Sequence, residues 1–85
     1  MKELIEFIAK SIVDKPDEVI VVEVPSEEGV ILKLQVAPED TGKVIGKEGR
    51  IAKAMRTLLR VAAIRKGTRA TLEIVSDQEP PEDNV

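Results

Sequence analysis

The stretch TGKVIGKEGR, residues 41–50, contains three glycines and three cationic side chains between segments with the patterns of ordinary helix and strand. Within it, GKEG (46–49) is too short to be a flexible linker. Two glycines let the backbone take positive φ angles and pass close to a ligand, while amide groups at the start of the following helix point outward. Such a spot favours phosphate, and Lys47 and Arg50 add a long-range attraction. The stretch predicts a phosphate-holding turn between two helices.

The segments on either side of this turn predict its two helices and a strand. RIAKAMRTLLRVAAIRKG, residues 50–67, has the spacing of a long amphipathic helix that Gly67 caps at its C-terminus. Its core face is expected to hold Ile51, Met55, Leu58 and Ala62. ATLEIV (70–75) alternates as a strand does. Before the turn, Pro38 and two acidic residues are typical of a helix start, so a short helix is expected over 38–45.

The N-terminal part predicts one helix and a β-hairpin. An apolar stripe at helical spacing indicates an amphipathic helix over residues 2–13. The stripe consists of Leu4, Ile5, Ile8 and Ile12, widened by Phe7 and Ala9. VIVVEV (19–24) and VILKLQVA (30–37) have strand patterns, and PSEEG (25–29) predicts the turn between them, with Pro25 leaving the first strand.

The element order is therefore α-β-β-α-α-β. The connection between the second and third strands is long enough to make them parallel, so we expect an α+β fold with a mixed three-stranded sheet and three helices on one face. A chain of 85 residues has enough apolar surface for one small core. We expect a single domain over residues 1–76 and an acidic, proline-bearing, flexible tail over 77–85.

The charges of the chain are strongly segregated. The net charge is −3, yet residues 41–70 hold nine basic residues and one acidic residue, a net charge of +8. The remainder carries −11. The basic residues are Lys43, Lys47, Arg50, Lys53, Arg56, Arg60, Arg65, Lys66 and Arg69. The acidic average therefore does not argue against a nucleic-acid partner, because phosphate contacts depend on the local charge.

The composition disfavours catalysis, metal binding and membrane insertion. The chain has no cysteine and no histidine, so thiolates and imidazoles are missing as nucleophiles, general bases and metal ligands. We expect no enzyme activity, no cofactor and no metal. No run of about 18 apolar residues exists, and the N-terminal MKELIEFIAK is acidic where a secretion signal is cationic. A soluble cytoplasmic protein is the expectation.

The segment VIGKEGRIAKAM, residues 44–55, resembles the core of a KH domain, whose signature is an apolar pair followed by Gly-x-x-Gly. An additional helix and strand in front resemble the prokaryotic, type II version of that domain. Residues 2–75 fit the resemblance, and the chain looks like the small bacterial single-KH RNA-binding proteins, the Khp family. In this order of elements the motif is specific, although the tetrapeptide alone is weak.

The resemblance implies single-stranded RNA binding and assigns roles to particular residues. KH loops clamp about four nucleotides by their backbone. On that comparison, the sugar-phosphate backbone would be contacted by Gly46, Lys47, Glu48 and Gly49. Supporting charge would come from Lys43, Arg50 and Lys53, and the apolar groove for bases from Ile45 and Ile51, supported by Leu34 and Val36. Two residues depart from the usual pattern: Glu48 puts a carboxylate in the loop, and Ala52 stands where many KH domains have a larger aliphatic side chain.

Other interpretations of the turn remain open or fail. GKEG is also compatible with a plain connection between helices, while a DNA-reading helix-turn-helix does not account for the sheet. A nucleotide-binding P-loop fails because only three residues separate Gly42 from Gly46 and Glu48 stands where Ser or Thr would hold magnesium. The only aromatic residue, Phe7, lies on the stripe of the first helix, so stacking platforms for bases are not expected.

We therefore expect an RNA chaperone or post-transcriptional regulator, with ribosome-associated binding left open. The alternative is a protein-interaction module that keeps the KH shape. The long helix has more apolar residues than one core face needs, and the extra ones indicate a contact with another subunit. They come from the set Leu58, Leu59, Val61 and Ile64. The resemblance implies a homodimer or a heterodimer with a larger, Jag-like RNA-binding protein that also carries a KH domain.

Overall fold

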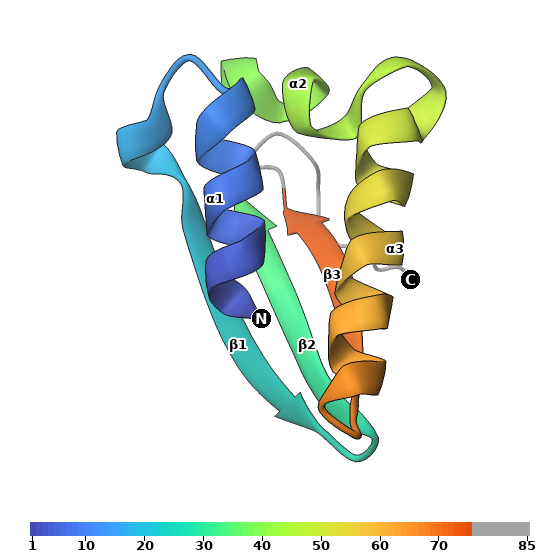
Figure 1. The fold of residues 1–85 in the computed structure, drawn as a ribbon. Helices are drawn as coiled ribbons and strands as arrows, with labels where there is room; N and C mark the ends of the chain where they lie inside the picture. The colour runs from blue at the N-terminus through green and yellow to red at the C-terminus, as the bar shows by residue number, and fades with distance from the viewer. Residues whose placement is uncertain (76–85) are drawn as a thin grey trace, which may run out of the picture.

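The computed structural model describes residues 1–75, which form a three-stranded sheet with three α-helices on one face (Figure 1). The α-helices are α1 (Lys2–Ile12), α2 (Thr41–Ile45) and α3 (Arg50–Arg65), and the strands are β1 (Ile20–Ser26), β2 (Gly29–Gln35) and β3 (Arg69–Val75). Short 3-10 turns occupy Pro16–Glu18, Pro38–Asp40 and Lys47–Gly49. The predicted α-β-β-α-α-β order and α+β class are confirmed. The predicted tail, 77–85, lies outside the described residues.

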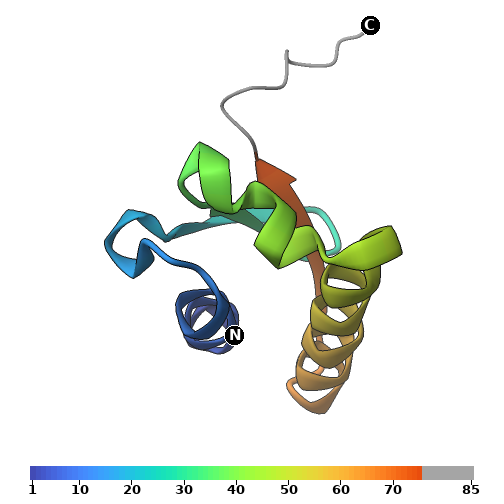
Figure 2. The ribbon, with the colours of Figure 1, turned by 90° about the horizontal axis from the view of Figure 1, so that it is seen from above.

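The sheet is mixed, as predicted, with β2 in its centre. β1 pairs antiparallel with β2, so that Val21 lies opposite Leu34, and β3 pairs parallel with β2, so that Leu72 lies opposite Leu32. Seen from above, α1 and α3 lie on the same side of the sheet (Figure 2). Because a parallel neighbour needs a long crossover, the α2–α3 pair is the element that brings β3 beside β2.

The first strand continues further than its sequence indicates. β1 extends through Ser26 and pairs Pro25 with Val30, so the prediction that Pro25 ends the strand is wrong. β1 is an edge strand, where a proline costs no hydrogen bond to a further strand. Glu27 and Glu28 alone form the turn to β2.

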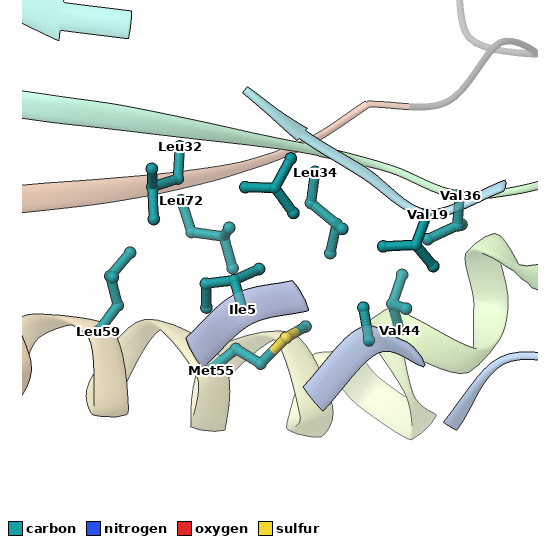
Figure 3. Close-up of a cluster of buried hydrophobic side chains, with 11 residues drawn as sticks. Ile5, Val19, Leu32, Leu34, Val36, Val44, Met55, Leu59 and Leu72 are labelled. Carbon is teal, nitrogen blue, oxygen red and sulfur yellow. The ribbon is translucent and has the colours of Figure 1, made fainter. Parts of the chain in front are cut away.

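The core lies between the sheet and the helices (Figure 3). Leu32, Leu34 and Leu72 of the sheet face Met55 and Leu59 of α3. α1 and α2 also contribute to the core, through Ile5, Ala9 and Val44. Burial of these apolar side chains fixes how α3, and the turn before it, sit on the sheet.

The buried face of α3 differs from the prediction by one residue along the helix. The observed face consists of Ala52, Met55, Leu59 and Ala63. Met55 is buried as expected, but Leu58 is 49% exposed. α3 has apolar residues on two adjoining faces, and the small Ala52 and Ala63 let the helix approach the sheet closely. The C-terminus follows the expectation at Gly67, because the Gly67 and Thr68 amides bond back to the Ile64 and Ala63 carbonyls.

Phe7 is not part of the apolar stripe of α1. Its side chain is 72% exposed, whereas Ile5 and Ala9 are fully buried. Two residues along an α-helix correspond to about 200° of rotation, so Phe7 lies on the opposite side of the helix from both neighbours. The single aromatic side chain is therefore a surface residue, and the sequence-based reason for dismissing it as a stacking group does not hold.

The start of α2 is tied to the connection that follows α1 by a buried carboxylate. Asp40 is 1% exposed, and its Oδ2 accepts the backbone N–H of Lys15 at 3.0 Å. At the surface, the Lys15 ammonium donates a hydrogen bond to the Glu39 carboxylate, which lowers the pKa of Glu39 and raises the pKa of Lys15. Because buried carboxylates need such donors, these contacts help to fix α2 and hence the turn that follows it.

Candidate nucleic-acid interface

The turn between α2 and α3 holds three residues with positive φ angles. Gly46 has φ 79° and ψ 174°, Glu48 has φ 58° and ψ 24°, and Gly49 has φ 77° and ψ 15°. Such angles are unfavourable for residues with a Cβ. The turn is tightened by the Gly49 amide, which bonds to the Gly46 carbonyl at 3.1 Å. It is therefore a fixed backbone shape and not a loose connection.

The two glycines of the turn serve different purposes. A Cβ on Gly46 would lie 2.7 Å from Ile51 Cγ1 and 2.9 Å from the Ile51 nitrogen, so only glycine allows the chain to fold against the first turn of α3. A Cβ on Gly49 would meet nothing nearer than Lys53 Cε, at 3.9 Å. Gly46 therefore holds the turn against the protein, while the Gly49 backbone faces open space.

The N-terminus of α3 has no side chain across it. Its N-cap residue is Gly49, which makes no side-chain cap, and its first turn contains no acidic residue. The first amides of a helix have no partner within the helix and carry partial positive charge. A phosphate oxygen could therefore be bound here by the backbone, with Lys47 and Arg50 close by in sequence.

The charged residues predicted for the site lie around the turn, with different surroundings. Arg50 is exposed and pairs with Glu48 at 3.6 Å, and the Glu48 side chain is itself 70% exposed. The carboxylate thus projects into water rather than across the turn. Lys53 lies alongside Gly49. Lys43 instead pairs with Asp14, at 3.6 Å, in the connection after α1, so its charge is directed away from the turn.

The apolar residues predicted for the groove divide into two groups. Ile45 and Ile51 are half-buried and pack against the core from either side of the turn. Leu34 and Val36 are 0% and 2% exposed, inside the core. These two residues therefore present almost no surface to a ligand, so they support the predicted groove from within the core and do not line it.

The strand that borders open space next to α3 is β3. It forms the edge of the sheet, so one side of its backbone faces no other strand among residues 1–75. A hollow of about 230 Å³ lies there, lined by Arg56, Arg60, Ala70, Thr71 and Leu72. Arg56 Nε donates to the Leu72 carbonyl at 3.4 Å, which shows that this carbonyl points to the free edge.

Sequence reasoning treated Arg56, Arg60 and Arg65 alike, and the structure separates them. Arg56 and Arg60 line the hollow beside β3, and Arg65 does not. The signal was present in the spacing, because Gly49, Lys53, Arg56 and Arg60 follow one another at intervals of four, three and four residues. These intervals form a straight row along a helix. Identifying the row required knowing which side of α3 faces the core.

A β-α-α-β core with a glycine-bounded turn between its helices, preceded by an additional helix and strand, defines a type II KH domain. A sequence model of the family described as KhpA/KhpB, KH domain, matches residues 2–74. The chain belongs to this family of small bacterial proteins.

Similar proteins support the assignment. The chain is 60% identical over 75 residues to a protein named RNA-binding protein KhpA from Clostridium perfringens, covering 88% of this chain and 100% of that relative. The same figures apply to the RNA-binding protein KhpA of Clostridium acetobutylicum. That of Treponema pallidum is 55% identical over 74 residues, which is 87% of this chain and 92% of the relative. No solved structure matches. Within residues 1–75, no helix has the length and apolar character needed to cross a membrane.

Proposed function

We propose that this protein binds single-stranded RNA and that the GKEG turn grips the RNA backbone. The observation that carries the proposal is the turn itself: a fixed positive-φ backbone at the uncapped N-terminus of a long helix, flanked by cations. This geometry suits a phosphate group. The relatives that match nearly the whole chain are named RNA-binding proteins, which supports the same ligand.

In this proposal the residues around the turn have separate roles. Gly46 to Gly49 present the backbone that lies against the sugar-phosphate chain, about four nucleotides long in KH domains. Lys47 and Arg50 attract phosphates, and Lys53 extends the charge along α3. Supporting apolar surface comes from Ile45 and Ile51. Lys43 contributes at longer range, because it faces Asp14.

Charge reversal at the turn tests the proposal. Lys47→Glu should weaken binding of a short single-stranded RNA, measured by fluorescence anisotropy, and should flatten its dependence on salt. Lys33→Glu is the matched control, because Lys33 is an exposed lysine of the central strand, away from the turn. If Lys47→Glu and Lys33→Glu bind the RNA with equal affinity, the turn is not part of the RNA-binding site.

The cellular role we propose is that of an RNA chaperone or post-transcriptional regulator in the bacterial cytoplasm, without catalysis or a cofactor. A KH turn holds RNA without changing it covalently, so its effect on a transcript comes from occupying or reshaping the strand. The role can be tested by recovering the RNA that is bound in cells to the native protein and, in a second strain, to the Lys47→Glu variant. Regulated transcripts should be present in the first sample and lost from the second.

The exposed side of α3 favours a second function, self-association or pairing with a related subunit. Leu58, Val61 and Ile64 are 49%, 50% and 65% exposed and follow one another along the helix. Of the four apolar residues considered from sequence, only Leu59 belongs to the core. Large exposed apolar side chains grouped on one helix are typical of contact surfaces.

We propose that this stripe forms a homodimer or a heterodimer with a Jag-like RNA-binding protein, since the family description pairs KhpA with KhpB. Two linked RNA sites would raise affinity through effective concentration. Sedimentation of the protein alone and mixed with such a partner tests this, and a monomer in both cases would contradict it.

A further inference from the structure

The acidic tail, residues 77–85, carries a charge opposite to that of the surface around the GKEG turn. It contains four acidic residues and no basic residue, a net charge of −4. The acidic residues are Asp77, Glu79, Glu82 and Asp83. Because the whole chain carries −3, the remaining residues carry +1. The acidic character of this protein therefore comes from its tail.

This tail lies outside the part of the chain that matches the family. The KhpA/KhpB family match covers residues 2–74. The two Clostridium relatives are matched over their whole length by 75 of the 85 residues. The domain that these relatives share with this chain thus ends where the tail begins, and the tail is an addition to it.

The tail begins at the end of the molecule that holds the GKEG turn. Val75, the last residue of β3, pairs with Gln35, the last residue of β2. After β2 the chain continues into the Pro38–Asp40 turn and α2, and Figure 1 shows the end of β3 at the same end of the molecule as α2. These two helical segments are together about 14 Å long, whereas the chain from Val75 to Asp83 can span up to about 28 Å. The tail is therefore long enough to bring carboxylates beside the turn.

The cations at the turn are open to a further carboxylate. Lys47 and Lys53 are exposed and take part in none of the ion pairs formed within residues 1–75. Arg50 pairs with Glu48 at 3.6 Å, with both side chains largely exposed, and exposed pairs of this kind contribute little. The backbone amides at the start of α3 are uncapped by any side chain. The groups that suit an RNA phosphate therefore also suit a carboxylate.

We propose that the surface around the GKEG turn binds the protein's own acidic tail, which competes there with RNA. The inference rests on the proposed RNA-binding function and adds an intramolecular ligand to the same site. A tethered ligand has an effective concentration on the order of 1 mM, so weak contacts are enough to occupy the site for much of the time. RNA must displace the tail, and a ligand with several correctly spaced phosphates does so better than a weak polyanion.

The size of the effect follows from the fraction of molecules whose site is free. Apparent affinity falls in proportion to the population that can bind. A tail that occupies the site for about 70–90% of the time lowers RNA affinity by about threefold to tenfold. Both the tail and RNA are held by charge, so salt weakens the competition as well as the binding of RNA.

The test compares the native chain with two full-length variants whose net charges are equal. The tail variant combines Asp77→Asn, Glu79→Gln, Glu82→Gln and Asp83→Asn, which changes the net charge from −3 to +1. The control variant makes the same change of charge at four exposed residues of α1, β1 and the segments that flank β1. It combines Glu3→Gln, Glu18→Gln, Glu23→Gln and Glu27→Gln. Each protein is titrated with a single-stranded tetranucleotide at several salt concentrations, and circular dichroism checks that all three are folded.

We expect the tail variant to bind RNA about threefold to tenfold more tightly than the native protein at low salt, and the control variant to gain much less. The advantage of the tail variant should shrink as salt is raised. In ¹⁵N–¹H spectra without RNA, the amide signals of Gly46 to Gly49 should differ between the native protein and the tail variant. The same signals should agree between the native protein and the control variant.

The results that would overturn the inference differ from the one that would overturn the proposed function. If RNA binds and both variants gain equally, the effect comes from net charge alone and the tail is not a ligand of the turn. The inference fails in the same way if the tail variant gains nothing, or if its turn signals match those of the native protein. If none of the three proteins binds RNA, the proposed function fails and the competition fails with it.

Discussion

Replacing Gly46 by alanine should destabilise the protein, whereas the same change at Gly42, four residues earlier, should not. Gly46 has φ 79° and ψ 174°, a region that is essentially restricted to glycine and costs other residues roughly 1–3 kcal/mol. The new Cβ would also lie 2.9 Å from the Ile51 nitrogen. Backbone cannot move aside as a flexible side chain can, and overpacking of this kind adds about 1–3 kcal/mol. The total is roughly 2–6 kcal/mol.

Gly42 provides the matched control because it lies inside α2 and a Cβ there meets nothing within 4 Å. Alanine should stabilise it by about 0.4–1 kcal/mol, since it restricts the unfolded chain and favours helix. Urea unfolding followed by circular dichroism gives both values. For a domain of this size, where 1 kcal/mol corresponds to about 4–8 °C, the Gly46→Ala change lowers the melting temperature by roughly 8–48 °C. If Gly46→Ala is as stable as the native protein, the shape assigned to the turn is wrong.

Other substitutions test separate parts of the account. Leu59→Ala should cost about 2–5 kcal/mol of unfolding free energy and Leu58→Ala about 1 kcal/mol or less; equal costs in denaturation would contradict the observed face of α3. Asp40→Ala leaves the Lys15 amide without its acceptor and should lower the free energy of unfolding by about 1–3 kcal/mol in the same assay. Asp40→Asn should retain part of the contact. An unchanged free energy of unfolding in Asp40→Ala would show that Asp40 does not help to fix α2. Glu48→Gln should raise RNA affinity about twofold to tenfold at low salt, as a titration would show, whereas unchanged affinity would place phosphates away from Glu48. Val61→Asp should shift sedimentation toward the monomer without lowering tetranucleotide affinity, and an unchanged sedimentation profile would exclude the stripe as the contact.

The order of elements and the parallel pairing of β2 and β3 could be predicted because they depend on local signals. The β-branched runs, the helical turn that begins at Pro38 just before α2 and the helix end at Gly67 each have a physical cause within a few residues. The position of the GKEG turn followed in the same way. Glycine is also required at Gly46 by the close approach of Ile51, five residues later, which the spacing of apolar residues does not reveal.

The errors arose where several apolar residues compete for one face. α3 offers apolar side chains on two adjoining sides, and the choice of Leu59 over Leu58 for the core depends on how closely α3 approaches the sheet. The predicted groove rested on Ile45 and Ile51 with support from Leu34 and Val36, and no pattern in the sequence indicated that β3 is the edge strand beside α3. Strand order is a property of the whole sheet, so Arg56 and Arg60 could not be separated from the other cations before the fold was known.

The central claim is that the GKEG turn lies against the RNA backbone, and an NMR titration tests it most directly. In a series of ¹⁵N–¹H spectra, adding a single-stranded tetranucleotide should shift the amide signals of Gly46 to Gly49 and of the first turn of α3, while those in the middle of α1 stay in place. Shifts confined to α1 or to the uncovered face of the sheet around Val22, with the turn unchanged, would contradict the account.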